Sequence, residues 1–301
     1  MRKAMLIAVA LIAYGSTNAP AANRSGWKLV WSDEFNYTGH PNPAKWGYEQ
    51  GYIRHNELQY YTVNRLANAR VDGKHLLIEL RKETPQSFLP TSINDKWHRY
   101  TSASVNTRHL AAWTYGRFVI RAELPKERST WPAIWFLSPL RTPNIPGPPQ
   151  HRLANGKEVH GPYRGPNHGE SSEGEIDLVE SWGSHSNRVA VHIHGTKGPT
   201  PHVSVTVPDL YTKFHTYELD WYPDHMDFFL DGKKIMTYTK DPSTGWSFDH
   251  PMYLIMNLAC AGPDNPAPND ADLPQFFKID YVRVYQKAPA SGEYIHGVRK
   301  R

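Results

Sequence analysis

The chain has 301 residues, which suits one large all-β domain or two small ones and allows a sizeable hydrophobic core. Its formal net charge of +5 is too small to indicate a nucleic-acid partner, and its single cysteine, Cys260, excludes an intramolecular disulfide. Aromatic residues make up 12% of the chain, with 10 Trp and 17 Tyr, so rings are available both for a core and for a surface that stacks on ligands.

The N-terminus has the pattern of a secretory signal peptide. Basic residues Arg2 and Lys3 precede an apolar run over 4–13 and a small-residue cleavage site, Ala19-Pro20-Ala21. The run is too short to span a membrane. We expect residues 1–21 to be removed, which lowers the formal net charge from +5 to +3. The mature protein is expected to be secreted, to the periplasm or the medium, with no membrane or nucleic-acid partner.

From Trp27 onward, short runs rich in Val, Ile, Tyr and Trp alternate with Gly, Pro, Asn and Asp turns. No stretch of helical length keeps a 3.6-residue period, so an antiparallel β-sandwich is predicted. Two Asp-Gly pairs, Asp72-Gly73 and Asp231-Gly232, predict hairpin turns. We expect one domain over 22–286 and a basic tail over 287–301. The clearest predicted strands are 28–31, 76–80, 117–121, 189–194, 216–221 and 281–285.

The stretch 174–180 reads Gly174-Glu175-Ile176-Asp177-Leu178-Val179-Glu180 and carries three acids in a strand of otherwise apolar residues. Glu175 and Asp177 share a strand face, whereas Glu180 would point the opposite way in a regular strand. A β-bulge at Leu178-Val179 returns Glu180 to the face of the other two. A solvated acidic edge strand is the alternative, and the apolar residues between the acids disfavour it.

Two converging carboxylic acids can hydrolyse a glycosidic bond, one as nucleophile and one as general acid/base. The spacing Glu-x-Asp-x-x-Glu resembles glycoside hydrolase family 16, in the bulged form of its laminarinase, agarase and carrageenase branches. The resemblance implies a jelly-roll sandwich with a concave substrate groove. Further motifs follow in the order of the laminarinase-like branch: Trp31-Ser32-Asp33-Glu34-Phe35, Asn56-Glu57-Leu58-Gln59-Tyr60-Tyr61, Tyr115-Gly116-Arg117, Trp131-Pro132-Ala133-Ile134-Trp135, Asp231-Gly232 and Asp280-Tyr281-Val282-Arg283-Val284-Tyr285.

The resemblance implies a role for each acid in a retaining mechanism. Glu175 is the expected nucleophile and Glu180 the expected acid/base. Asp177 is expected to hydrogen-bond the nucleophile and to ease charge separation. The resemblance also implies that one histidine on the following strand reaches the cleft near the leaving group, and we assign this role to His194. A zinc site at His192 and His194 would need a third ligand that the sequence does not suggest.

Substrate binding is expected at two further motifs. Trp131 and Trp135 lie four apart and so share a strand face, where they form either a stacking wall for sugar rings or part of the core. Asn56 and Gln59 resemble the hydrogen-bonding residues of the family's minus subsites. Glu57, between them, is interpreted as part of a polar turn.

A structural calcium is implied by the resemblance at Glu34, Gly73 and Asp280, on the convex side. Carboxylate and carbonyl oxygens are ligands that calcium accepts. No cofactor is expected to be required for catalysis.

The sequence departs from the family in a Pro, Gly and His-rich insertion between Pro139 and Glu173, and in Asn257-Leu258-Ala259-Cys260-Ala261-Gly262, which lacks the usual Gly-Gly-x-Trp. These departures leave the substrate open. We predict a secreted, monomeric, retaining endo-glycosidase that acts on a polysaccharide, with β-1,3-glucan as the expected substrate. The alternatives are a galactan hydrolase, and a non-catalytic glucan-binding lectin that the complete set of acids disfavours.

Overall fold

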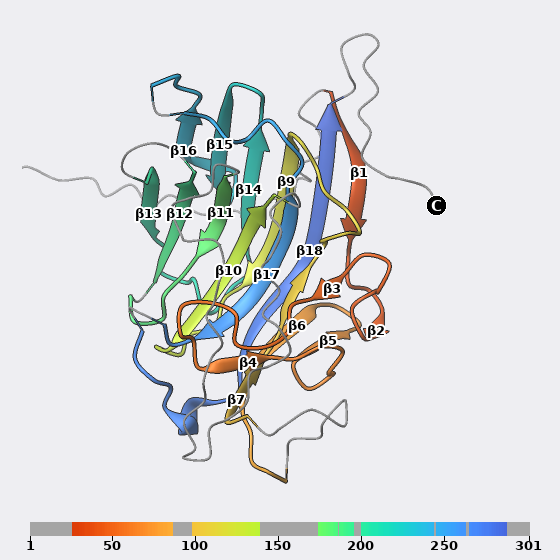
Figure 1. Cartoon of the computed structure of the whole chain (residues 1–301), viewed down its shortest axis with the longest axis vertical. Helices are drawn as coiled ribbons and strands as arrows, with labels where there is room; N and C mark the ends of the chain where they lie inside the picture. The colour runs from red at the N-terminus through yellow and green to blue at the C-terminus, as the bar shows by residue number, and fades with distance from the viewer. Residues whose placement is uncertain are drawn as a thin grey trace, which may run out of the picture.

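The computed structural model describes residues 26–86, 98–138, 174–185, 187–195, 200–243, 245–262 and 265–287. The predicted signal peptide, the insertion between Pro139 and Glu173 and the tail after residue 287 lie outside the described residues. Within them the chain forms two facing β-sheets (Figure 1). The prediction of an all-β sandwich is therefore confirmed.

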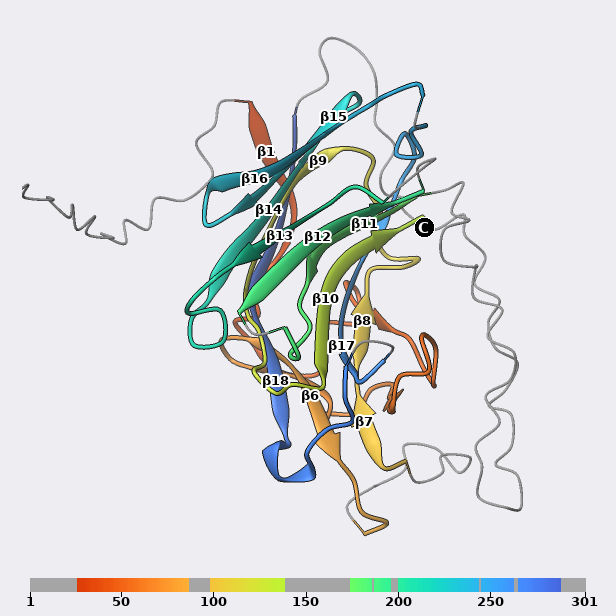
Figure 2. The same ribbon diagram turned by 90° about the vertical axis from the view of Figure 1, so that its left-hand side faces the viewer.

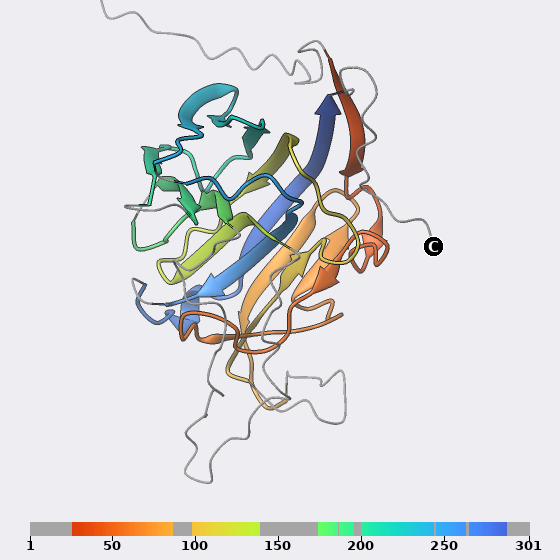
Figure 3. The same ribbon diagram turned by 45° about the horizontal axis from the view of Figure 1, so that its top comes forward.

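The larger sheet contains the long C-terminal strand β18 near its centre (Figure 3). Strand β1 (Trp27–Asp33) also pairs with β18, β7 (Tyr100–Ser102) pairs with β6, and β4 (Gln59–Tyr61) pairs in parallel with β7. The spatial order is β16 (Lys233–Thr239), β15 (His225–Leu230), β14 (His215–Trp221), β9 (Gly116–Glu123), β18 (Gln275–Lys287), β6 (Leu76–Lys82), β5 (Ala69–Asp72) and β2 (Thr38–Gly39).

The smaller sheet is antiparallel throughout and carries the acidic stretch in its interior. One short 3₁₀ helix, η2 (Asp270–Asp272), precedes β18. No helix in the described ranges has the length and apolar character needed to cross a membrane. The order of the smaller sheet is β13 (His202–Thr206), β12 (Arg188–His194), β11 (Glu175–Glu180), β10 (Thr130–Leu137), β17 (Tyr253–Cys260), β8 (Ser104–Asn106) and β3 (Gly47–Tyr48).

Both predicted hairpins form. Asp72-Gly73 connects β5 to β6, and Asp231-Gly232 connects β15 to β16. Asp231 and Gly232 have φ of +50° and +76°, the positive values at both central residues that a type I′ turn requires. All six of the clearest predicted strands lie within observed strands.

The core lies between the two sheets, and it determines which face of the smaller sheet is left for function. Ile134 and Phe136 of β10 pack into this core, whereas Ala133, Trp135 and Leu137 form a separate cluster on the opposite, outer face. In Figure 2 β10 bends along its length. The functional side chains described below project from this curved outer face.

Candidate active site

Strand β11 presents apolar side chains to the core and carboxylates to the outer face. Ile176, Leu178 and Val179 belong to the core cluster between the sheets. Asp177 pairs directly with Trp135 of β10, whose side chain belongs to the outer cluster, and directly opposite residues share a sheet face. The acids therefore lie on the outer face.

The register shows the predicted bulge. Along β10, Ile134 pairs with Val179 and Trp135 pairs with Asp177, so Leu178 is an extra residue without its own partner. Strand β12 shows the same offset, because Asp177 pairs with His192 and Glu180 pairs with Ala190. The extra residue lets two consecutive side chains, Leu178 and Val179, face the core, and it returns Glu180 to the face of Asp177.

Gly174 allows the strand to begin where it does. Its φ is +73°, in the region that favours glycine. A Cβ atom at this position would lie 2.6 Å from the ring of Phe248 and 2.8 Å from the carbonyl oxygen of Ser247. A side chain here would push Glu175 away from the cluster.

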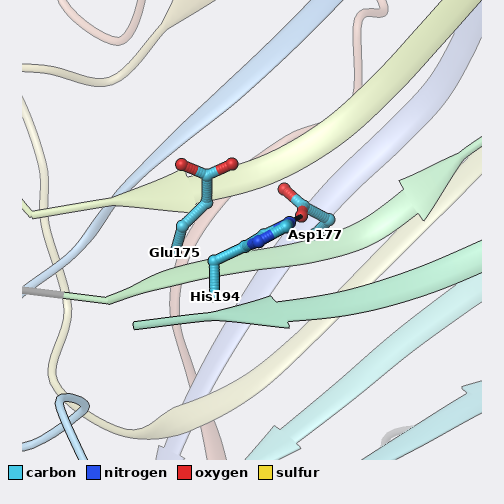
Figure 4. Close-up of side chains that lie close together, drawn as sticks. All are labelled: Glu175, Asp177 and His194. Atoms are coloured by element: carbon cyan, nitrogen blue, oxygen red, sulfur yellow. Dashed lines mark ion pairs between the residues drawn. The ribbon is translucent and has the colours of Figure 1, made fainter. Parts of the chain in front are cut away.

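Asp177 lies between the two glutamates. One oxygen of Glu175, one of Asp177 and a ring nitrogen of His194 lie within 4.8 Å of one another, and the same holds for Asp177, Glu180 and His192. The exposed fractions of Glu175, Asp177 and Glu180 are 8%, 4% and 9%. Figure 4 shows Glu175 and Asp177 on the same side of the ribbon, with the His194 ring directed at Asp177.

Burial is the main cause that raises the pKa of Asp177 well above its ordinary value, and repulsion from Glu175 and Glu180 raises it further. Nε2 of His194 lies 3.1 Å from Oδ2 of Asp177. Burial alone would lower the pKa of His194, but the hydrogen bond and charge of Asp177 outweigh burial and raise that pKa to about 9. The pair therefore holds more protons near neutral pH than two free side chains would.

Both oxygens of Glu180 have a nitrogen neighbour. Nε1 of Trp131 donates to Oε1 at 2.9 Å, and Nδ1 of His192 lies 2.6 Å from Oε2. Trp131 also packs against His55 and Trp182, at centroid distances of 5.3 and 5.6 Å. The sequence predicts either a stacking wall or a core position for Trp131, and for His192 it offers one signal, the strand face shared with His194.

Trp135 lies on the same face but is 6% exposed. Its Nε1 donates to Oδ1 of Asn257 at 2.8 Å, and Asn257 in turn donates to the hydroxyl of Tyr61 at 2.9 Å. The guanidinium of Arg54 lies 4.8 Å from the centre of the Trp135 ring. Trp135 thus packs beneath the outer surface, and the sequence reading missed Asn257, Tyr61 and Arg54 as its partners.

The prediction that Gln59 binds substrate needs correction. Gln59 is fully buried; its amide donates to Glu57 at 2.6 Å and its oxygen accepts from the backbone N–H of Cys260 at 2.6 Å. Glu57 is also buried, and burial raises its pKa to about 7. A side chain without exposed surface cannot contact a sugar. Gln59 instead holds the loop to β17 through its bond to Cys260, and Glu57 holds Gln59. Asn56 is exposed in the same loop, beside the His55 ring that contacts Trp131.

The predicted calcium ligands are engaged by other groups. Arg283 donates to both carboxylate oxygens of Glu34, at 3.0 and 2.7 Å, and Arg121 pairs with Asp280. Gly73 lies in the β5–β6 turn with φ of +96°. Carboxylates suit calcium, but each one here is paired with a guanidinium that a calcium ion would have to displace. Calcium binding at these residues stays a prediction.

The sequence suggested no third ligand for a zinc site at His192 and His194, but the fold brings the carboxylate of Asp177 close to both histidines. Asp177 completes two groups with the spacing of metal ligands, one with Glu175 and His194 and one with Glu180 and His192. In the part of the chain that the structure describes, these are the two groups of acids and histidines that are close enough to share a metal ion, and both belong to the candidate active site.

The chain is similar to known proteins in sequence and in fold. The family described as Glycosyl hydrolases family 16 matches residues 163–283. The chain is 36% identical over 277 residues to a β-glucanase of Rhodothermus marinus, covering 86% of this chain and 85% of the relative. It is 31% identical to a glucan endo-1,3-β-glucosidase of Cryptopygus antarcticus, covering 86% and 92%. The crystal structure of the laminarinase from Rhodothermus marinus superposes with a TM-score of 0.71 at 36% identity, over 87% of this chain and 98% of that one.

Proposed function

Because the chain belongs to glycosyl hydrolase family 16, we propose that it is an endo-glycosidase that hydrolyses internal bonds of a β-1,3-glucan with retention of configuration. The observation that supports this most directly is the bulged strand β11, which gathers Glu175, Asp177 and Glu180 on one face. A β-glucanase and a laminarinase among the similar proteins support the same substrate class.

We assign to the acids the roles that the family resemblance implies. Glu175 attacks the anomeric carbon while Glu180 gives its proton to the leaving oxygen, and Glu180 then takes a proton from the water that releases the glycosyl group. Asp177 is protonated more readily than an ordinary aspartate, so it can donate a hydrogen bond to a neighbouring carboxylate. The indole N–H of Trp131 orients Glu180. Trp131 and its neighbour Trp182 offer ring faces beside the acid for sugar stacking.

A reducing-sugar assay on laminarin, lichenan, agarose and carrageenan tests the substrate. We expect turnover of laminarin, and of lichenan at a lower rate, with none on the two galactans. The Glu175→Gln variant serves as the matched control, since it keeps the side-chain shape and removes the nucleophile. Turnover of agarose or carrageenan alone would establish the galactan alternative. Laminarin binding without turnover would establish the lectin alternative.

We further propose that the chain is exported and acts as a monomer. The signal-peptide pattern of residues 1–21 supports export. N-terminal sequencing of the protein recovered from outside the cytoplasm should begin at Ala22. Light scattering should give the mass of a single chain.

A further inference from the structure

His192 contacts the oxygen of Glu180 that Trp131 leaves available. Trp131 reaches Oε1 from β10, on one side of β11, and His192 approaches Oε2 to 2.6 Å from β12, on the other side. In this structure the His192 contact is close without the alignment of a hydrogen bond. Neighbours on both adjacent strands thus confine the carboxyl group of Glu180.

The bulge brings these two residues together. Glu180 pairs with Ala190, so His192 is its diagonal neighbour two residues along β12 on the same face. In a regular strand of the same sequence, without the bulge, Asp177 and Glu180 would point to opposite faces, and His192 could contact only one of them. The bulge that brings the three acids to one face therefore also brings His192 into contact with Glu180.

The ring of His192 is held in place by its neighbours. Trp182 packs edge-on at a centroid distance of 5.7 Å, and the rings of His194 and His202 lie at 6.1 and 5.6 Å. One carboxylate oxygen of Asp177 and one of Glu180 lie within 4.8 Å of a nitrogen of the His192 ring. The titratable groups around His192 are thus two acids on β11, His194 on β12 and His202 on β13. Because the His192 ring is packed in this way, its contact with Oε2 can restrict the orientation of the Glu180 carboxyl group.

The two carboxyl oxygens of Glu180 have different hydrogen-bonding roles. An indole N–H can only donate, so Oε1 must accept from Trp131 whether Glu180 is neutral or ionised. The carbonyl oxygen of a neutral acid is its better acceptor, so the Trp131 contact favours the proton on Oε2, the oxygen that faces His192. An Nδ1–H of the imidazole can donate to Oε2 whether Glu180 is neutral or ionised, so the O–H of the neutral acid stays directed at the leaving oxygen. His192 can accompany Glu180 through both steps of the reaction.

We propose that His192 is a positioning residue for Glu180, which holds the proton-bearing oxygen in the orientation required for transfer to the leaving group. This rests on the proposed function, in which Glu180 is the acid/base. His192 should contribute to the rate of the step in which the leaving oxygen is protonated. The size of its effect on kcat/KM should therefore depend on how much the leaving group needs a proton.

The test compares His192→Asn with His225→Asn. His225 lies on β15 in the other sheet and makes a similar pair with a carboxylate, Nδ1 to Oδ1 of Asp224 at 2.7 Å. On laminarin, we expect His192→Asn to lower kcat/KM by about 10- to 100-fold, the lower part of the range of general acid catalysis. On a dinitrophenyl β-glycoside, whose leaving group needs no proton, the loss in kcat/KM should stay below about 3-fold. His225→Asn should match the wild type on both substrates.

The second arm repeats the substitution in a Glu180→Ala background. If His192 acts through Glu180, adding His192→Asn there should cost nothing further on laminarin. An equal loss on both substrates, or a full additional loss in the Glu180→Ala background, would overturn the proposal. If His192→Asn does not fold, His192→Gln is read by the same criteria. A Glu180→Ala enzyme that keeps wild-type turnover of laminarin would instead overturn the proposed function.

Discussion

His194 and Asp177 form an ion pair across β11 and β12, with Nε2 of the histidine 3.1 Å from Oδ2 of the aspartate. The pKa of His194 rises to about 9, because the bond to Asp177 outweighs the effect of burial. The pKa of Asp177 is raised too, by burial and by the two glutamates. In both cases the folded state binds more protons than the unfolded state, so both groups make stability fall as pH rises.

This gives a prediction for the pH dependence of stability. The part due to His194 is fully present below about pH 6.5, the ordinary pKa of histidine, and is lost as pH rises to about 9. His194→Gln should therefore show a smaller drop in urea midpoint between pH 6 and pH 9.5 than the wild type. His225→Asn, on the other sheet, should leave the slope unchanged. A His194→Gln slope equal to that of the wild type would mean that the pair does not carry this proton.

The stereochemistry of the reaction is a second prediction. In the proposed mechanism Glu175 displaces the leaving group and water then displaces Glu175 from the same carbon, so two inversions retain the configuration. A β-linked substrate should give a β-configured product first. Proton NMR in the first minutes of hydrolysis, before mutarotation, measures this directly. An initial α-anomer would contradict the assignment of Glu175 as nucleophile.

A third prediction concerns the bulge. Because Leu178 has no partner on β10 or β12, its deletion leaves every other pair of β11 unchanged and the three acids on one face. The deletion variant should fold, with stability lower by about 2–5 kcal/mol for the lost core side chain. Its kcat/KM should fall at least tenfold, because the strand loses the local bend and twist of the bulge, which aim the Glu180 side chain at Trp131 and His192.

Deletion of Ile176 is the matched control for this prediction. It lacks a bulge residue to absorb the change, so it should turn Glu175 toward the core and abolish activity. Thermal melts and kcat/KM on laminarin distinguish the two deletions. Equal activity in the two deletion variants would show that the bulge does not set the orientation of the acids.

Gly174 and Gly232 give a paired prediction on backbone conformation. Both have positive φ, but a Cβ on Gly174 would clash with Phe248, whereas a Cβ on Gly232 has nothing within 4 Å. Gly174→Ala should destabilise by about 2–5 kcal/mol, from strain and overpacking together, and should lower activity. Gly232→Ala should cost only the strain, about 1–2 kcal/mol, with activity retained. Urea unfolding measures both, and equal costs would contradict the packing argument.

Calcium binding is tested through the two arginines. A bound ion would have to displace Arg283 from Glu34 and Arg121 from Asp280. The double variant Arg121→Ala, Arg283→Ala should therefore bind calcium more tightly than the wild type, and calcium at a hundredfold excess over Kd should stabilise it by about 2.7 kcal/mol. Melting temperatures after chelation and calcium return provide the measurement. No rise in either protein would reject the calcium prediction.

Local patterns were sufficient to predict the elements of the fold. Apolar alternation identified the strands, and Asp-Gly pairs identified two hairpins, because these signals arise from residues adjacent in the chain. The bulge was predictable for the same reason. Because Glu180 comes three residues after Asp177, the three acids can share one face only if the strand contains an extra residue, and Leu178 is that residue.

The environment of each side chain was decided by the tertiary structure. Gln59 was predicted to bind substrate from its motif, but the approach of Cys260, far along the chain, buries it completely. His192 and His194 are equivalent in strand spacing, yet one contacts Glu180 and the other Asp177. Contacts of this kind depend on the register between strands and on what packs over them. The sequence by itself determined which face of β11 carries the acids, and only the pairing of β10, β11 and β12 decided what each acid touches.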